Sequence, residues 1–207
     1  LQQIVFKEHE GSFLVGMIAA MKSQTGTVGF VGGMDIPLIR KFHGGYEQGA
    51  KYVNADINVL MNMTGTTPEA WNNPTKGAEL TKAQIDKGAD VIYQAAGGTG
   101  IGVLQAAADA GVYGIGVDAN QNYMHPGSVL TSMLKRVDVA VYNAFKTTMD
   151  GTYETGVFTL GLAEDGVGWA LDEHNESLIT ADMQNAVEKA KADIISGKIN
   201  VVDVSAQ

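Results

Sequence analysis

Short, almost continuously apolar runs alternate along the chain with stretches in which apolar residues recur at helical spacing. The apolar runs of the first part are residues 25–33, 57–63, 90–95 and 112–118. The helical stretches between them are 37–53, 72–88 and 100–111. Strands buried on both faces have this continuous apolar character, and strands that alternate with helices form parallel sheets. Since crossovers between parallel strands are right-handed, the pattern predicts an α/β fold with a doubly wound parallel sheet.

The same periodicity extends to both ends of the chain. It predicts strands at 4–6, 129–134, 156–162 and 166–171, and helices at 11–23, 134–151 and 180–198. Two of the helices carry clear end signals. Asn73 and Thr180 stand at capping positions, and Gly88 and Gly197 follow the last turns.

Charge and composition disfavour several classes of function. The 207 residues carry a formal net charge of −9, and an acidic surface repels phosphate backbones, so we expect no nucleic-acid partner. The chain has no cysteine, and its four histidines follow no metal-binding spacing, so we expect no metal site and no cofactor.

The chain opens on LQQIVF, which contains a strand pattern and no initiator methionine. We therefore expect an upstream segment that carries a signal sequence and a lipid-bearing cysteine. That anchor would be the protein's one contact with the membrane.

Polar and aromatic residues follow the predicted strands at the points where they end. Because ligands bind beyond the carboxyl ends of strands in an open parallel sheet, these residues should line one rim. The set is Asp35, Thr64, Trp71, Tyr93, Gly97, Gly98, Thr99 and Asp118. Aromatic faces and carboxylates together suit a neutral, polyhydroxylated ligand that carries a ring.

Several of the candidate residues have an alternative interpretation. The glycines of GGTGIG match neither a dinucleotide fingerprint nor a P-loop, so they either approach a ligand or form a tight strand-to-helix turn. Asp118 either accepts hydrogen bonds from a vicinal diol or caps a turn. Trp71 either stacks on a ligand or covers the sheet edge, and Lys135 by itself is typical of a solvated charge.

Several stretches together resemble the basic membrane protein family of bacterial substrate-binding lipoproteins, the purine nucleoside receptors of ABC importers. The stretches are FKEHEGSFLVGMIAA, VGFVGGMDIPLIRKFHGGYEQGA, NNPTKGAELTKAQIDKGADVIYQAAGGTGIGV, YGIGVDANQ and VLTSMLKRVDVAV. The resemblance implies a type I periplasmic-binding-protein fold, in which two doubly wound lobes joined by three crossovers close on the ligand. It also implies that Asp118 binds the ribose hydroxyls, that Lys135 reaches the ligand, and that Tyr93 to Gly98 lie beside the base and sugar.

The family's N-terminal Asp-rich and Phe-bearing motif is absent from this chain, so the first lobe is expected to be incomplete. The resemblance implies that residues 1–23 end lobe 1, 24–122 form most of lobe 2, 123–152 return to lobe 1 and 153–207 complete lobe 2. On this division the strand at 4–6 loses its sheet neighbours and the helix near 137–145 exposes an apolar face. The chain alone should therefore self-associate.

The leading functional hypothesis is a solute-binding protein that delivers a purine nucleoside or base to an ABC permease without chemistry. It would work in the periplasm or on the outer face of the cytoplasmic membrane. A sugar-binding protein of the same fold is the first alternative. The second is a doubly wound nucleotide-dependent enzyme, for which the sequence offers neither a phosphate fingerprint nor a nucleophile–base pair.

Overall fold

The computed structural model describes residues 1–206. Its strands are β1 (Gln2–Phe6), β2 (Thr27–Met34), β3 (Asn58–Gly65), β4 (Val91–Ala95), β5 (Tyr113–Asp118), β6 (Val129–Lys135), β7 (Gly156–Leu160) and β8 (Val167–Trp169). Its α-helices are α1 (Glu8–Lys22), α2 (Pro37–Val53), α3 (Pro74–Ile85), α4 (Thr99–Asp109), α5 (Val137–Met149) and α6 (Ala181–Ile195). Short 3-10 turns are η1 (Pro68–Trp71), η2 (Asn122–Met124), η3 (Glu176–Leu178) and η4 (Val204–Ala206).

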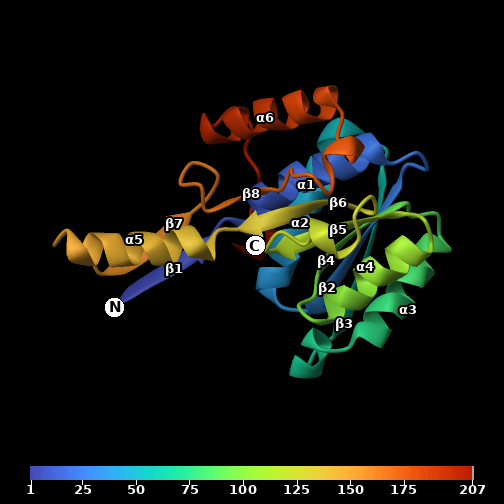
Figure 1. Cartoon of the computed structure of the whole chain (residues 1–207), viewed down its shortest axis with the longest axis horizontal. Helices are drawn as coiled ribbons and strands as arrows, with labels where there is room; N and C mark the ends of the chain where they lie inside the picture. The colour runs from blue at the N-terminus through green and yellow to red at the C-terminus, as the bar shows by residue number, and fades with distance from the viewer. Residues whose placement is uncertain (207) are drawn as a thin grey trace.

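The larger sheet has six strands in the order β3-β2-β4-β5-β6-β8 (Figure 1). Every neighbouring pair is parallel except β6 and β8, which run antiparallel. The predicted α/β fold with a parallel sheet is confirmed. Both predicted caps are also present, because the side chains of Asn73 and Thr180 accept hydrogen bonds from the first turns of α3 and α6.

Helices cover both faces of this sheet. Helices α1 and α2 pack against each other in one layer, and α3 and α4 pack against each other in the second. Successive strand residues point to opposite layers, as the pleat of a strand requires. Phe30 and Tyr93 belong to the main hydrophobic core, whereas their neighbours Val31 and Ile92 belong to a smaller core that includes Val103 of α4.

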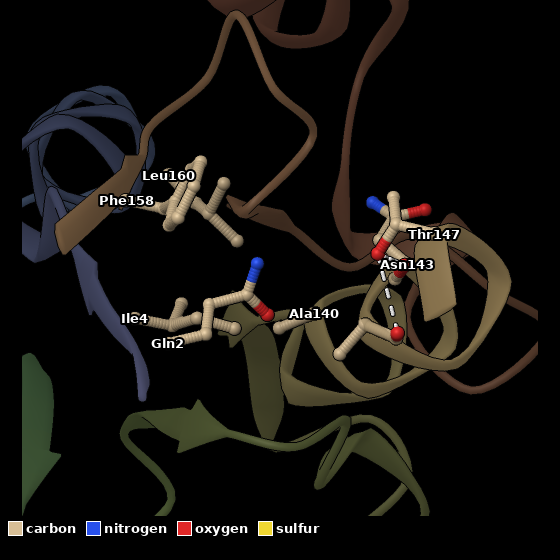
Figure 2. Close-up of a pocket in the computed structure, with 8 residues that line it drawn as sticks. Gln2, Ile4, Ala140, Asn143, Thr147, Phe158 and Leu160 are labelled. Atoms are coloured by element: carbon tan, nitrogen blue, oxygen red, sulfur yellow. Dashed lines mark hydrogen bonds between the residues drawn. The ribbon is translucent and has the colours of Figure 1, made fainter. Parts of the chain in front are cut away.

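A second, smaller sheet consists of β1 and β7, which pair in parallel. With α5 it extends away from the larger sheet (Figure 1). One face of α5 turns toward β1 and β7, across an apolar hollow of about 170 Å³ that Gln2, Ile4, Ala140, Asn143 and Phe158 help to line (Figure 2). Val141, Phe145 and Met149 of the same helix are exposed, and Val141 and Phe145 line a second hollow together with Gln2 and Ile4.

Three sequence-based expectations need correction. The first helix begins at Glu8 rather than residue 11, so Glu8, His9 and Glu10 lie in its first turn and are buried. Leu134 lies within β6, one residue before its end, instead of beginning α5, because it pairs with Asp118 and Gly168 on the adjacent strands. The strand at 4–6 also keeps a neighbour, since β1 pairs with β7 along its whole length.

The two sheets divide the chain differently from the predicted lobe boundaries. Within residues 1–23, β1 belongs to the small sheet, but α1 packs on α2, β6 and β8 of the larger body. Within 123–152, β6 belongs to the larger sheet and only α5 leaves it. Within 153–207, β7 joins β1, whereas β8 joins β6. The chain therefore changes sheets near Phe6, Lys135 and Leu160.

Candidate functional site

The carboxyl ends of five parallel strands meet at one edge of the larger sheet. In the order of the strands, this edge carries Thr64, Asp35, Gly97, Asp118 and Lys135. The register brings the last two strands level, because Asp118 pairs with Leu134, the residue before Lys135. Four of these residues, Thr64, Asp35, Gly97 and Asp118, were assigned to one rim from the sequence, and the sheet order brings them together there with Lys135.

Strand order reverses between β2 and β4, because β3 follows β2 on one side and β4 lies on the other. Such a switch point is where open α/β sheets bind ligands. Trp71, the last residue of η1, covers it. A Cβ added to Gly33 would lie 2.2 Å from Cζ3 of Trp71, and one added to Gly97 would lie 3.5 Å from its Cε3. Trp71 is half-buried, so one side of its ring covers the sheet edge while the residue still reaches solvent.

The glycines after β4 serve mainly to bring backbones together. A Cβ on Gly100 would meet Oε1 of Gln94 at 2.1 Å, and one on Gly102 would meet the carbonyl oxygen of Pro74 at 1.9 Å. Close packing of α4 on α3 and on β4 thus explains these two positions. Gly97 differs, because it has φ +57 and forms the turn into α4 at the sheet edge. Gly98 follows it and caps the helix.

Two of the rim candidates lie inside the protein. The Tyr93 side chain is fully buried between Phe30 and Tyr46, and its hydroxyl lies 3.2 Å from Oγ of Ser12. Thr99 is also buried, and its hydroxyl donates to the carbonyl of Ala70 and accepts from the amide of Asn73. The expectation that Tyr93 lies beside a ligand is therefore not supported, because its ring has no accessible face in this structure.

Asp35 forms an ion pair with Arg40 at the surface. Its two carboxylate oxygens accept hydrogen bonds of 2.7 and 2.8 Å from Arg40 in the first turns of α2. This bidentate pair lowers the pKa of the Asp35 carboxyl below its ordinary value. A ligand hydroxyl would have to share or replace the arginine at this position.

Asp118 and Lys135 line an open hollow of about 530 Å³. The other lining residues are Ala119, Asn120, Leu134, Arg136, Val137 and Asp138. Asp118 has φ +64, a left-handed conformation that residues other than glycine adopt rarely, although Asp and Asn adopt it more often than most, and such residues cluster at functional sites. Its side chain reaches solvent, yet protein surrounds it on most sides, and this burial raises the pKa of its carboxyl. The Lys135 ammonium acts in the opposite direction, and Glu8 adds to the rise.

A polar network beneath Asp118 holds this strained turn. Gln121 accepts from the Val117 amide at 2.9 Å and from the Gln94 side chain at 2.8 Å. The backbone amide of Gln121 donates to the Ser132 hydroxyl, and this hydroxyl donates to the side-chain oxygen of Asn122. The run of amide side chains in ANQN is a sequence signal for such a network.

The network ends at Asp172, which accepts hydrogen bonds from the side chains of Asn120 and Asn122 and from the His174 amide. Burial opposes ionisation of Asp172, but these hydrogen bonds together lower the pKa of its carboxyl. Ionised Asp172 therefore holds the loop after β5 in place, and this loop holds Asp118 in place.

Lys135 has a buried partner that the sequence analysis missed. Its Nζ lies 3.0 Å from Oε1 of Glu8, which is 2% exposed at the start of α1. Glu8 was not assigned a role because the strand was expected to end at residue 6 and the helix to begin at residue 11. A helix that began three residues earlier would have turned Glu8 inward.

Other kinds of site receive no support within the described part of the chain. Residues 1–206 contain no group of three or more His, Cys, Asp or Glu side chains arranged to hold a metal ion. Over the same residues, each helix is too short or too polar to span a lipid bilayer.

Comparison with known proteins agrees with the fold. The family model described as ABC transporter substrate-binding protein PnrA-like matches residues 1–204. Basic membrane protein D of Borreliella burgdorferi is 37% identical over 97% of this chain and 59% of its own length. The ABC transporter nucleoside-binding protein BmpA of Lactococcus lactis is 36% identical over 95% of this chain and 58% of its own length. The chain thus spans somewhat less than three fifths of these two relatives.

Among solved structures, an ABC transporter solute-binding protein from Aeropyrum pernix K1 superimposes with a TM-score of 0.84. It is 32% identical, and the match covers 97% of this chain and 66% of that one. These proteins bind solutes for transport, and the family is not one of enzymes. The chain belongs to the family of PnrA-like ABC transporter substrate-binding proteins.

Proposed function

We propose that this chain forms the greater part of an extracytoplasmic receptor that binds a purine nucleoside and presents it to an ABC permease. One observation carries the proposal. Asp118 holds a carboxylate in a strained conformation beside the Lys135 ammonium, in an open hollow at the carboxyl edge of the sheet. A carboxylate there can accept hydrogen bonds from both hydroxyls of a ribose, and an ammonium can donate to ring or hydroxyl oxygens.

The base would be held from the switch point. Trp71 offers an aromatic surface there, and the Gly97–Gly98 turn keeps side chains away from a flat ring. Asp35 would contribute by sharing its carboxylate with Arg40. Tyr93 would support the edge from within the core rather than touch the ligand.

The chain crosses between the two sheets at three passages, near Phe6, Lys135 and Leu160, and these passages provide a hinge. They lie close together. The backbone amide of Lys7 donates to the carbonyl of Leu160 at 2.9 Å, and the backbone amide of Arg136 donates to the carbonyl of Gly166 at 2.8 Å. Contacts from both sides of a bound ligand would favour the closed arrangement and thereby drive closure. The receptor would be lipid-anchored or free outside the cytoplasmic membrane.

The proposal is tested by calorimetry on the full-length natural protein with inosine, guanosine, hypoxanthine and ribose, followed by chromatography of the recovered ligand. Binding of the nucleosides and their unchanged recovery would support a nucleoside receptor. Tight binding of ribose alone would favour the sugar-binding alternative, because Asp118 recognises a diol whatever else is attached. Recovery of a new product would indicate an enzyme.

A further inference from the structure

Four charged side chains of alternating sign lead from the C-terminal segment to the hollow. The Oδ2 atom of Asp203 lies 3.4 Å from Nζ of Lys41, which lies 3.2 Å from Oε2 of Glu8. The other oxygen of Glu8 lies 3.0 Å from Nζ of Lys135. Asp118 lines the hollow beside Lys135 and continues the alternation.

Glu8 is the buried centre of this row. A carboxylate that is 2% exposed is costly to keep ionised unless cations compensate it, and Lys41 and Lys135 do so from opposite sides. Removing Glu8 would leave two lysines facing each other without the anion between them. The position of each ammonium therefore depends on Glu8.

The Lys135 ammonium is held from more than one direction. Besides the ion pair with Glu8, its Nζ lies 5.3 Å from the centre of the Phe6 ring and 5.9 Å from that of Phe42. Both distances are within the range of cation–π attraction. The ion pair engages one of the three N–H donors of the ammonium, which leaves donors for a ligand in the hollow.

The same ion pair joins two of the passages between the sheets. Glu8 begins α1 two residues after the end of β1, and Lys135 is the last residue of β6 before α5. Lys41 strengthens the link, because its Nζ also donates to the carbonyl of Phe6 at 2.7 Å. Any movement of one passage relative to the other would therefore shift the position of the Lys135 ammonium.

We infer that Glu8 is a positioning residue for ligand binding, which holds the Lys135 ammonium beside Asp118 and ties that position to two of the three passages between the sheets. This inference rests on the proposed function, because it assigns Glu8 its effect through a ligand-binding Lys135. Glu8 itself does not touch the ligand. Its loss should weaken nucleoside binding only as long as Lys135 is present to be misplaced.

The test is a double-mutant cycle on the full-length natural protein, read by calorimetry with inosine. Glu8→Gln, Lys135→Met and the double variant are compared with wild type, and thermal unfolding is measured for each. We expect Glu8→Gln to raise the Kd for inosine roughly tenfold, which is the order of one hydrogen bond to a charged group. In the Lys135→Met background the same change should alter Kd less than about twofold, as residues that act through one another are not additive.

Glu10→Gln is the matched control. Glu10 lies two residues after Glu8 in the first turn of α1 and is also buried, but it pairs with Lys7 at 3.0 Å and accepts from the Leu162 amide at 2.9 Å. Its loss should lower the midpoint of thermal unfolding and leave the Kd for inosine within about twofold, since it holds a passage without holding Lys135. A merely structural role for Glu8 would give the same result as Glu10.

Two results would overturn the inference while leaving the proposed function intact. One is an unchanged Kd in Glu8→Gln, and the other is an equal loss with and without Lys135. A wild-type protein that binds no nucleoside would overturn the proposed function and the inference with it. Should Glu8→Gln fail to fold, Glu8→Asp carries the same cycle. It keeps the charge but shortens the reach, and again the loss should disappear in the Lys135→Met background.

Discussion

Trp71 lies so close to Gly33 that a methyl group on the glycine would come within 2.2 Å of the indole atom Cζ3. Gly33 lies near the end of β2, and Trp71 closes the turn after β3. The contact spans the switch point of the sheet and explains the glycine at position 33. The indole can lie flat on the strand end only if that position has no side chain.

Gly33→Ala should therefore displace Trp71. Overpacking of this kind lowers the free energy of unfolding by about 1–3 kcal/mol. In a Trp169→Phe background the fluorescence of Trp71 should shift to longer wavelength as the indole moves into water. Gly168→Ala is the control, because a Cβ there meets nothing within 4 Å. Equal stability and emission in the two variants would show that Trp71 does not rest on Gly33.

Asp118→Asn should raise the stability of the chain at neutral pH. Burial holds the pKa of Asp118 above its ordinary value. The stability that it contributes is thus full below the unfolded pKa, about 4, and is lost as pH rises through the folded pKa. Asparagine removes the partly desolvated charge and tolerates the left-handed backbone. The midpoint of thermal unfolding should rise at pH 7, and the gain should shrink toward pH 3. A gain that is the same at both pH values would contradict a titrating Asp118.

Asp172→Asn should have the opposite effect. Despite the opposing influence of burial, hydrogen bonds from Asn120, His174 and Asn122 hold the pKa of Asp172 below its ordinary value. Its contribution to stability is present above the unfolded pKa and is lost as pH falls through the folded pKa. The variant should unfold at a lower temperature at pH 7, and the difference should vanish in acid. A loss of stability that persists unchanged at pH 2 would show that the substitution acts through packing and not through the charge of Asp172.

The exposed apolar residues of α5 should make the 207-residue chain self-associate. Val141, Phe145 and Met149 follow at helical spacing, and Phe145 is 68% exposed. Contiguous exposed apolar patches of this kind favour self-association. Light scattering should give a mass above the 21.8 kDa of one chain, and Val141→Lys with Phe145→Glu should bring it down to that value. The isolated exposed Ile101 is the control, and Ile101→Lys should leave the mass unchanged. A monodisperse wild-type monomer would refute the prediction.

Much of the fold could be predicted because its signals are local. The apolar runs at 90–95 and 112–118 are strands, and Asn73 caps its helix, since the residues that decide these features are neighbours in sequence. Parallel strands must also end at a common edge. That is why Asp35, Thr64 and Asp118 could be assigned to one rim before their order in the sheet was known.

The rest depended on contacts between distant residues. Whether Tyr93 pointed to the edge or to the core depended on Phe30 and Tyr46, which lie on other elements. Periodicity could not fix the start of α1, because EHE contains no apolar residue to mark a buried face. Glu8 is buried by Lys41 and Lys135, and such pairing of charges leaves no trace in an apolar pattern.

The central claim is that Asp118 recognises the sugar of a nucleoside, and Asp118→Ala in the full-length natural protein tests it most directly. Calorimetry with inosine and with hypoxanthine compares ligands with and without a diol. We expect the change to weaken inosine binding by about 1.5–3 kcal/mol, the range for hydrogen bonds to a charged group, and to affect hypoxanthine far less. Asp118→Asn separates this loss from backbone strain, because asparagine accepts the left-handed conformation that alanine resists. Equal losses of affinity for inosine and hypoxanthine would contradict the claim.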